Sequence, residues 1–529
     1  MKRQPLPATA PHTSMSIPGI TMSSHRHGRR YDCPKAFLWA FALYFIAIMP
    51  ILRADRYYVD DMGRALTGYL GWSGDGRPLA NVFMEVFNLG TPLTDISPLP
   101  QIVSIAILAA LAVSVARYFR INGTILPALV FAPMVIGPLF LENLSYKFDA
   151  LTMTLAVFLA LVTVLKTRAD LTGALLGILG LVASLSLYQP AFNVFLVFTT
   201  IQLVYLQRQD APVPVWAGLL VMRVAQALAA LILYKPLATS SIKGAYSARH
   251  SQLAPFSDLP AVVGRNVLLF WDYVTAALTS IWGRTLLIWI AAAIIVALGF
   301  SIRYIMRHWA GRPAWQRLLM VVAALGIVPA LVMTCWGPML ALLHPVLLPR
   351  TMIGFGALAA GASLLIVLAL PAHLSPRWRA GIAAVPLLGL VLFSHVYGNT
   401  LKLQKDLEDS LARQISDDLA VIAAERELRQ FTMIGHASRP AVARNNMKKY
   451  PLLRVLVPVH LRDEWGWPVD QLQHFGLTVT MAKEPERPEL IKHVCHDDAQ
   501  PIVRRGSYRV YAADDLAVVV LGDARCEAP

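Results

Sequence analysis

The sequence contains few charged residues. Asp, Glu, Lys and Arg make up 15% of its 529 residues, whereas soluble globular domains carry about 25%. Hydrophobic residues make up 56% of the chain, and its mean hydropathy is +0.54. The apolar residues come in blocks of about 20, the length at which a helix crosses a bilayer. This composition excludes an ordinary soluble enzyme and a disordered protein.

Acidic residues are fewer than basic ones, which gives a net charge of +15. The basic residues lie mostly in short loops between apolar blocks. That distribution is typical of the signals that set the topology of a membrane protein, and not of a basic face that binds nucleic acid. We therefore predict the lipid bilayer as a partner and no nucleic acid.

Cysteine is rare, and several common motifs are missing. Four cysteines in 529 residues do not make a disulfide scaffold. The sequence has no GxxxxGK(S/T) nucleotide loop, no HExxH and no CxxC. Nothing therefore indicates an ATPase or a nucleotide-sugar pocket. If the chain is an enzyme, we expect its substrates to arrive on lipids.

The chain does contain a series of apolar segments. Eleven are candidate transmembrane helices: 36–52, 102–117, 124–141, 150–165, 171–188, 190–206, 213–234, 285–302, 318–335, 351–370 and 380–396. We therefore predict a polytopic α-helical membrane protein with about 11 transmembrane helices, within a domain at 35–397. Residues 1–34 are polar and lack apolar periodicity, which predicts a disordered cytoplasmic tail.

The loop charges predict the orientation. If the tail is inside, most basic loop residues also lie inside, as the positive-inside rule requires. Most acidic residues before residue 398 then fall in four outer loops, 53–101, 142–149, 235–284 and 336–350. Acidic residues affect insertion little, so their one-sided distribution indicates that the chemistry is on the outer face. The apolar but partly charged segment 260–280 predicts a helix lying on the membrane surface.

The composition changes after residue 398. Residues 398–529 hold 18 Lys and Arg and 19 Asp and Glu, a soluble balance. Helical periodicity predicts a helix over 400–430. Short apolar runs predict strands at 431–434, 455–459, 477–481, 508–511 and 517–521. We therefore predict a small α+β domain on the outer side.

Two of the four cysteines, Cys495 and Cys526, lie in this domain. An oxidising compartment favours their pairing, which a chain-entropy estimate values at about 3–4 kcal/mol. We expect a disulfide, and the alternative is two free thiols.

The first outer loop contains adjacent carboxylates, Asp60 and Asp61, followed by Arg64. One carboxylate can act as a general base on a hydroxyl, and both can hold a divalent cation, Mg²⁺ or Mn²⁺, against a phosphate. On a helix Arg64 shares their face, where it can clamp a phosphate or neutralise a carboxylate. The aromatic side chains of Tyr69 and Trp72 can stack on a sugar or anchor the loop at the interface. The alternative for the whole loop is a solvated, ion-paired segment.

The second outer loop is short and dense in titratable groups. Glu142, Lys147 and Asp149 fall within eight residues and must lie at the bilayer surface near the first loop. They can supply a further carboxylate and a cation to a site. The alternative is helix capping, because Asp149 directly precedes the next apolar segment.

Other polar residues lie near the ends of the apolar segments. Lys235 and Arg350 are phosphate-binding candidates, or cations that snorkel to the interface. Tyr188 and Gln189 can bind sugar hydroxyls or close a helical hairpin. Arg223 lies inside the apolar segment 213–234, where a charge costs at least ~2.5 kcal/mol, and we favour a structural role for it.

Three short motifs resemble the GtrII-type O-antigen glucosyltransferase family. They are Asp60-Asp61-Met62-Gly63-Arg64 with Gly68-Tyr69, Trp72 and Gly76-Arg77-Pro78-Leu79, then Glu142-Asn143-Leu144-Ser145-Tyr146-Lys147-Phe148-Asp149, and Leu187-Tyr188-Gln189-Pro190. The resemblance covers roughly 36–400 in arrangement. It implies a GT-C-like fold with a catalytic carboxylate on the first periplasmic loop. It also implies a polyprenyl-phosphate-linked glucose as donor, lipopolysaccharide O-antigen as acceptor, and a place in the bacterial inner membrane with a periplasmic C-terminal domain.

The resulting hypothesis is an inverting hexosyltransferase. Asp60 or Asp61 takes the proton of the acceptor hydroxyl, and Glu142 or Asp149 positions the sugar or a metal ion. Cations balance the departing lipid phosphate, the candidates being Arg64, Arg77, Lys147, Lys235 and Arg350. The alternatives are a flippase or transporter of lipid-linked sugars, an O-antigen polymerase or ligase, and a non-enzymatic anchor for the C-terminal domain.

Overall fold

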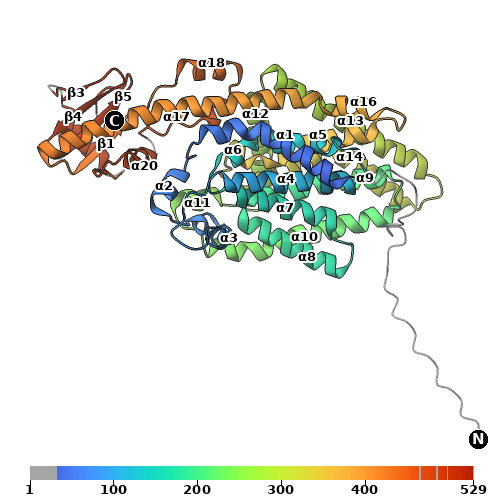
Figure 1. Ribbon diagram of the computed structural model, residues 1–529. Coiled ribbons are helices and arrows are strands. Elements are labelled where there is room, and N and C mark those ends of the chain that lie inside the picture. Colours follow the sequence, from blue (N-terminus) through green and yellow to red (C-terminus); the bar gives the residue numbers. More distant parts are fainter. Residues whose placement is uncertain (1–31, 464–465, 484–485, 497–498, 528–529) are drawn as a thin grey trace, which may run out of the picture.

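The computed structural model describes residues 32–463, 466–483, 486–496 and 499–527. Residues 1–31 of the predicted tail lie outside these ranges. The described chain forms a helical bundle with a small sheet at one end (Figure 1).

Six helices are long and apolar enough to cross a membrane: α1 (Cys33–Ala54), α4 (Leu99–Tyr118), α9 (Phe192–Arg208), α10 (Val213–Thr239), α13 (Ile281–His308) and α14 (Ala314–Trp336). Helix α9 reaches this length together with the turn before it, as the 20-residue span Gln189–Arg208. A seventh is the pair α16 (Pro376–Ala383) and α17 (Val385–Arg426), which meet at a bend of 45°. The chain is thus a multi-pass membrane protein by the length and composition of its helices.

The other four predicted spans are shorter helices: α5 (Leu126–Val135), α7 (Ala150–Lys166), α8 (Leu171–Leu187) and α15 (Ile353–Ala369). A helix of 17 residues reaches about 25 Å, and the hydrocarbon core is about 30 Å thick. The predicted segment 124–141 is helical only over the ten residues of α5, because the chain turns after Val135 and restarts as α6 (Leu141–Ser145). The count of eleven spans therefore stays a prediction, and six or seven are shown.

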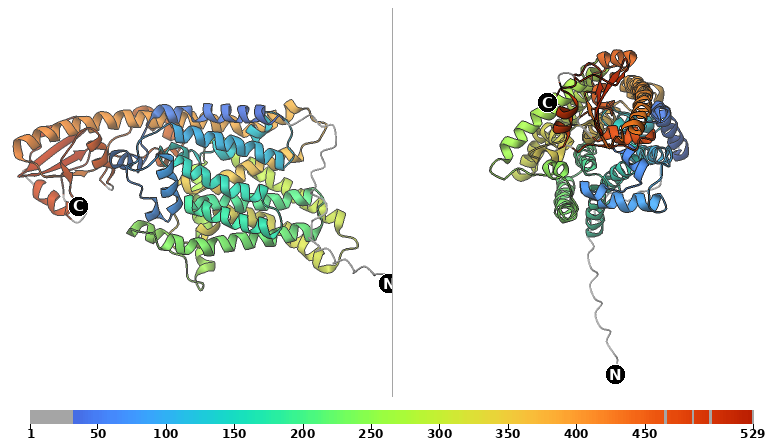
Figure 2. Two further views of the ribbon diagram at one scale, coloured as in Figure 1. Left: turned by 60° about the horizontal axis from the view of Figure 1, so that its bottom comes forward. Right: turned by 90° about the vertical axis from the view of Figure 1, so that its left-hand side faces the viewer.

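Helices α1 and α17 lie side by side along the bundle (Figure 2). Their contact depends on Gly398, where an added Cβ atom would lie 2.4 Å from the carbonyl carbon of Pro50. Two backbones can approach this closely only where one residue has no side chain. The first and last long helices of the bundle are therefore locked together.

Arg223 has a structural role inside the bundle. It is 1% exposed, and its guanidinium donates to the carbonyl oxygens of Thr163 (3.0 Å) and Val164 (2.9 Å) and to the side chains of Thr167 (2.6 Å) and Gln226 (2.9 Å). These carbonyls belong to the last turn of α7, where the helix dipole favours a cation. The buried charge thereby ties α10 to the end of α7.

Short elements cover one end of the bundle. They are α2 (Asp61–Thr67), η1 (Trp72–Asp75), α3 (Pro78–Phe87), η2 (Gln189–Ala191), α11 (Ala245–His250), α12 (Leu259–Ala277), η3 (Gly337–Ala341) and η4 (Pro349–Thr351). Helix α12 matches the predicted segment 260–280. It buries Val262, Asn266, Phe270 and Val274, one residue every four, and leaves Leu268 and Trp271 exposed.

The C-terminal region adds helices and a mixed sheet at the same end (Figure 1). The helices are α18 (Ala441–Lys449), α19 (Leu453–Leu456), α20 (Trp467–His474) and α21 (Arg487–Val494). The strands are β1 (Gln430–Ile434), β2 (Thr480–Met481), β3 (Val503–Arg504), β4 (Tyr508–Ala513) and β5 (Leu516–Leu521), in the order β2-β1-β5-β4-β3. Strand β1 runs parallel to β2 and β5, whereas β4 runs antiparallel to β3 and β5.

Most of the predicted elements of this region are present. Helix α17 continues to Arg426, and strands occur at 430–434, 508–513 and 516–521. The strand predicted at 455–459 is wrong: 455–456 end α19 and 457–459 form no strand, and Leu453, Leu456 and Val457 join the apolar core of the bundle. The run 477–481 forms a strand only over Thr480–Met481.

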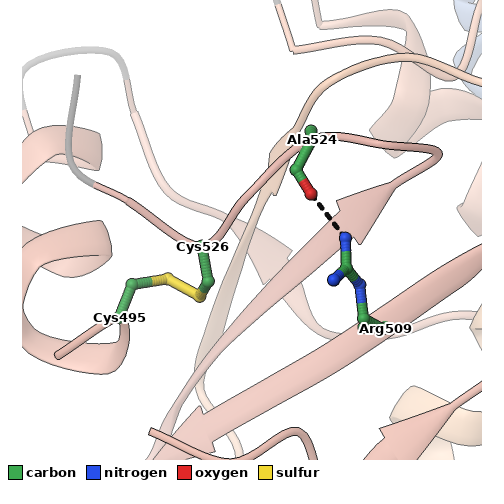
Figure 3. The surroundings of a disulfide bond; sticks show 4 residues. All are labelled: Cys495, Arg509, Ala524 and Cys526. Atoms are coloured by element: carbon green, nitrogen blue, oxygen red, sulfur yellow. Dashed lines mark hydrogen bonds between the residues drawn. A yellow bond between two sulfur atoms is a disulfide. The ribbon is translucent and has the colours of Figure 1, made fainter. Parts of the chain in front are cut away.

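A disulfide joins Cys495 and Cys526, whose Cα atoms lie 5.1 Å apart (Figure 3). It fastens the end of α21 to the chain after β5. Next to it, Arg509 of β4 donates a hydrogen bond to the carbonyl oxygen of Ala524. The final residues of the described chain are thus fixed to the sheet domain at two points.

Candidate functional site

A cavity of about 1450 Å³ lies where the outer loops, the ends of the bundle helices and the C-terminal region meet. One wall is polar and is lined by Asp60, Arg64, Tyr69, Asp75, Arg77, Glu142, Asp149, Tyr188, Gln189 and Arg350. A second wall is apolar and is lined by Leu185, Leu231, Ile232, Met339, Leu342 and Leu348. The cavity can therefore hold a molecule that has both polar and apolar parts.

The adjacent carboxylates Asp60 and Asp61 take different places. Val59 has a positive φ of 52°, which turns the chain just before α2 begins. Asp61 is fully buried, and its oxygens accept the backbone N–H groups of Tyr58 (3.1 Å), Lys147 (2.7 Å) and Phe148 (3.3 Å). Asp61 thereby joins the first outer loop to the second, and burial raises its pKa to about 7.

Asp60 instead lies open to the large cavity. Within the described part of the chain, its carboxylate makes no ion pair and no side-chain hydrogen bond. The surrounding protein raises its pKa through desolvation, while the positive charge of Arg64 opposes that rise. An unpaired carboxylate with a raised pKa is suited to accept a proton.

Asp149 holds the polar wall together. Its 2%-exposed carboxylate accepts hydrogen bonds from Trp72 Nε1 (2.6 Å), Arg77 Nη1 (2.9 Å) and Arg64 Nη1 (3.2 Å). It occupies the N-cap position of α7, yet its side chain makes no capping bond. Capping therefore does not account for this carboxylate, which fixes the two arginines at the cavity.

The aromatic side chains of the first loop differ in exposure. Trp72 is fully buried, and the Arg64 guanidinium lies over its ring at 4.3 Å. Tyr69 is 44% exposed and lines the cavity, so of the two it is the one placed to contact a ligand.

Glu142 and Arg350 form a second fixed pair in the cavity. The carboxylate accepts from Arg350 Nη1 (2.8 Å) and from its backbone N–H (2.7 Å). Tyr188 donates its hydroxyl to the Arg350 carbonyl oxygen at 2.8 Å. These contacts join the second outer loop, the η2 turn and the segment before α15, three segments that are distant in sequence.

Gln189 of the polar wall and Lys235 of α10 both line the large cavity. Gln189 Nε2 donates to the carbonyl oxygen of Asp75 (2.8 Å) and to the hydroxyl of Tyr234 (2.9 Å). Lys235 is exposed beside the cavity and has no ion pair among the described residues. Its ammonium group is therefore available to an anion.

Lys147 faces a second, smaller cavity of about 320 Å³. Its Nζ atom pairs with Asp55 (2.6 Å) and Asp95 (3.2 Å) and lies over the ring of Tyr57 at 4.0 Å. Of the predicted site residues, Lys147, Asp61 and Trp72 do not line the large cavity, whereas the other outer-loop residues do.

A divalent cation held jointly by Asp60 and Asp61 does not fit this geometry. The Asp61 oxygens are used by backbone N–H groups, and only Asp60 lies open to the cavity. Across the described ranges there is also no group of three or more His, Cys, Asp or Glu residues that could hold a metal ion. The predicted cation stays a prediction, and no step below depends on it.

Sequence reasoning missed the contribution of the C-terminal region. His436, Arg439, Arg454, Arg462 and Trp467 line the same cavity. They are spread over 32 positions without a motif, and the helices α18 and α19 between them bring them together. The excess of basic residues in this stretch was the available signal.

Comparison with known proteins identifies the family. The family model for glucosyl transferase GtrII matches residues 49–360. A relative from Salmonella phage P22, described as "Uncharacterized 55.3 kDa protein in gtrB 5'region", is 29% identical over 433 residues, which is 80% of this chain and 87% of the relative. No solved structure matches the chain. The family match includes every polar residue of the outer loops that meets at the large cavity, and the chain belongs to the GtrII glucosyl transferase family.

Proposed function

We propose that this protein transfers glucose, or another hexose, from a polyprenyl-phosphate donor to lipopolysaccharide O-antigen on the periplasmic side of the bacterial inner membrane. One observation carries the proposal: the carboxylate of Asp60, which has no ion pair among the described residues, shares a cavity with several cations and with an apolar wall. Family membership supports the glucosyl transfer itself.

The apolar wall supports a lipid-linked donor. Ile232 lines the cavity and is 70% exposed, and Leu228, one turn earlier on α10, is 56% exposed. An apolar stripe of this kind on a membrane helix is in contact with lipid chains. A polyprenyl chain can therefore lie along α10 while its sugar phosphate enters the polar part of the cavity.

The reaction needs one base and no covalent intermediate. Asp60 takes the proton of an acceptor hydroxyl, whose oxygen attacks the anomeric carbon of the donor sugar. The bond between that carbon and the phosphate oxygen breaks, and its electron pair leaves with the lipid phosphate. The products are the new glycoside and polyprenyl phosphate, and the proton on Asp60 passes to water. A single displacement of this kind inverts the anomeric centre.

The departing phosphate gains negative charge, which nearby cations can stabilise. Arg77 and Arg350 line the cavity and are held by Asp149 and Glu142, so they are oriented before substrate binds. Lys235, which has no ion pair in the described part of the chain, adds a positive charge on α10 close to Leu231 and Ile232 of the apolar wall. Asp149 and Glu142 are therefore positioning residues in this scheme.

The Cys495–Cys526 disulfide supports a periplasmic place for the C-terminal region and for the cavity beside it, because disulfides persist in oxidising compartments. The predicted topology, with the N-terminus in the cytoplasm, also places the C-terminal region in the periplasm.

The test is transfer of labelled glucose from polyprenyl-phosphate-glucose to purified lipopolysaccharide by the detergent-solubilised protein. Asp60→Asn should lower kcat by at least ~100-fold, because it removes the general base. The matched control is Asp272→Asn, the same chemical change at an exposed position of α12 outside the cavity.

Full activity of Asp60→Asn would contradict the assignment of the base. Absence of transfer by correctly folded wild-type protein, with glucose and with other hexoses on the carrier, would favour a flippase of lipid-linked sugars. Transport has no meaning in detergent, so the assay separates the two functions.

A further inference from the structure

The large cavity has a third wall, made by the C-terminal region and rich in arginine. Arg439 and Arg454 line it, together with Arg462. Arg439 Nη1 donates to the carbonyl oxygen of Val457 (2.8 Å), and its Nη2 donates to that of Arg454 (3.2 Å). These carbonyls are uncharged, and neither Arg439 nor Arg454 forms an ion pair within the described ranges.

Among the described residues, the acids near Arg439 and Arg454 have other partners. Glu408 is the acid whose negative charge acts on Arg439. Its carboxylate already pairs with Arg56 at 2.6 Å and accepts the N–H of His460 at 2.8 Å. Asp463 also lines the cavity and accepts the N–H of Gly435 at 2.9 Å. Burial lowers the pKa of the Arg439 guanidinium, and the neighbouring arginines lower it further, while Glu408 opposes them. Such a surplus of positive charge favours an anion.

The arginine wall is attached to the turn that carries the proposed base. The Tyr58 hydroxyl donates to the carbonyl oxygen of Leu456 at 3.0 Å, and Arg56 Nη2 donates to that of Pro458 at 2.7 Å. Asp60 follows Tyr58 by two residues and opens into the same cavity. A ligand held by the arginines can therefore also reach Asp60.

We propose that Arg439 and Arg454 form an anion subsite that binds a phosphate or carboxylate group of the acceptor glycan while Asp60 holds its reacting hydroxyl. This inference rests on the proposed glycosyl transfer. The acceptor is the suitable substrate because the donor phosphate must lie next to the apolar wall, which α10 and residues 338–348 provide. The cations assigned to the donor phosphate are Arg77, Arg350 and Lys235, which also line the cavity. The subsite then selects for acceptors that carry a negative charge.

The test measures binding of lipopolysaccharide micelles to the full-length protein without donor. The double variant Arg439→Gln/Arg454→Gln should bind at least ~10-fold more weakly, since each lost charge-assisted hydrogen bond is worth about that factor. Lys448→Gln/Lys449→Gln, an equal loss of two charges at exposed positions of α18 outside the cavity, should bind as the wild type does. Arg439→Lys with Arg454→Lys should restore part of the affinity.

Two treatments of the acceptor identify the anionic group. Hydrogen fluoride removes phosphates, and carbodiimide followed by borohydride reduces carboxylates to alcohols. One of the two treatments should weaken the binding of lipopolysaccharide to the wild type and leave its binding to the double variant unchanged. Wild-type affinity of the folded double variant for intact lipopolysaccharide would overturn the proposal, as would equal loss of affinity in both proteins after treatment.

Kinetics separate this subsite from a merely structural role. In the transfer assay the double variant should raise the KM for acceptor about 10-fold and leave kcat and the donor KM unchanged. A loss of kcat with an unchanged acceptor KM would overturn the subsite. If the wild type transfers no sugar, the proposed function fails, and the binding experiment still decides whether the arginines hold an anion.

Discussion

The two cavities at the end of the bundle next to the C-terminal region share the segment after α1 but differ in their unpaired groups. In the smaller cavity the charged groups are paired, Lys147 with Asp55 and Asp95, and Arg56 with Glu408. In the larger cavity Asp60 and Lys235 have no ion pair among the described residues. Paired charges hold loops in place, whereas unpaired charges remain available to a substrate.

The same contrast separates two neighbouring residues. Asp61 accepts three backbone N–H groups and connects the outer loops, and Asp60 faces open space. Two adjacent titratable residues therefore have different roles: Asp61 holds the loops in position, and Asp60 is available to a substrate.

The largest effect is expected from Asp149→Asn. The change leaves the buried guanidiniums of Arg64 and Arg77 without full compensation, and breaking a buried ion pair costs about 3–5 kcal/mol. We expect a clearly lower melting temperature in detergent together with loss of transfer. Asp75→Asn is the control, because its half-exposed pair with Arg77 at 3.3 Å contributes at most about 1 kcal/mol. Equal effects of the two variants would show that Asp149 does not organise the wall.

Asp61 should make stability depend on pH. Its pKa lies at about 7 in the folded protein against 3.8 for a free side chain, so the folded state favours the protonated form. The corresponding stability is fully present below pH 4 and is lost as the pH rises through 7. Over that range the loss amounts to at most about 4 kcal/mol.

Asp61→Asn removes this titration. Unfolding of the variant, followed by denaturation at pH 5 and pH 8, should depend less on pH than unfolding of the wild type. The variant also carries a pH-independent cost, because an amide NH₂ group would face a backbone N–H. A pH dependence identical to that of the wild type would rule out Asp61 as its source.

The sequence was sufficient to predict that the polar residues of two distant loops lie close together, as they do at the large cavity. Asp60, Arg64 and Arg77 lie in the predicted outer loop 53–101, and Glu142 and Asp149 lie in the short predicted outer loop 142–149. Loops predicted on the same side must lie at the same membrane surface. Hydropathy also placed a helix in each of the eleven predicted spans, although four of them are shorter than a usual crossing helix.

Sequence could not tell which way each side chain points. The different roles of Asp60 and Asp61 depend on the left-handed turn at Val59 and on N–H groups of a loop 86 residues away. Likewise Arg439 and Arg454 reach the cavity only because α18 and α19 pack against the bundle, where a strand was predicted. Long-range contacts of this kind leave no periodic pattern in the sequence.

A smaller effect is expected from Lys147→Gln, which tests whether the two cavities are functionally distinct. Lys147 bridges Asp55 and Asp95, and Asp55 is 71% exposed and is solvated once the pair is broken. We expect a loss of stability of roughly 1 kcal/mol and a transfer rate close to that of the wild type. A loss of kcat as large as that of Asp60→Asn would instead place Lys147 on the reaction path and join the two cavities into one site.

The smallest effect is expected from Lys235→Gln at the edge of the apolar wall. Its ammonium group is exposed, so its attraction to the donor phosphate is screened by water and salt, and its removal should raise the donor KM about two- to fivefold. The difference from the wild type should shrink in high salt, whereas a loss caused by altered packing would not. Lys243→Gln is the matched control, because Lys243 is equally exposed but does not line the cavity. A rise in the acceptor KM with an unchanged donor KM would show that the donor phosphate does not bind next to α10. The assignment of the apolar wall to the lipid would then be wrong.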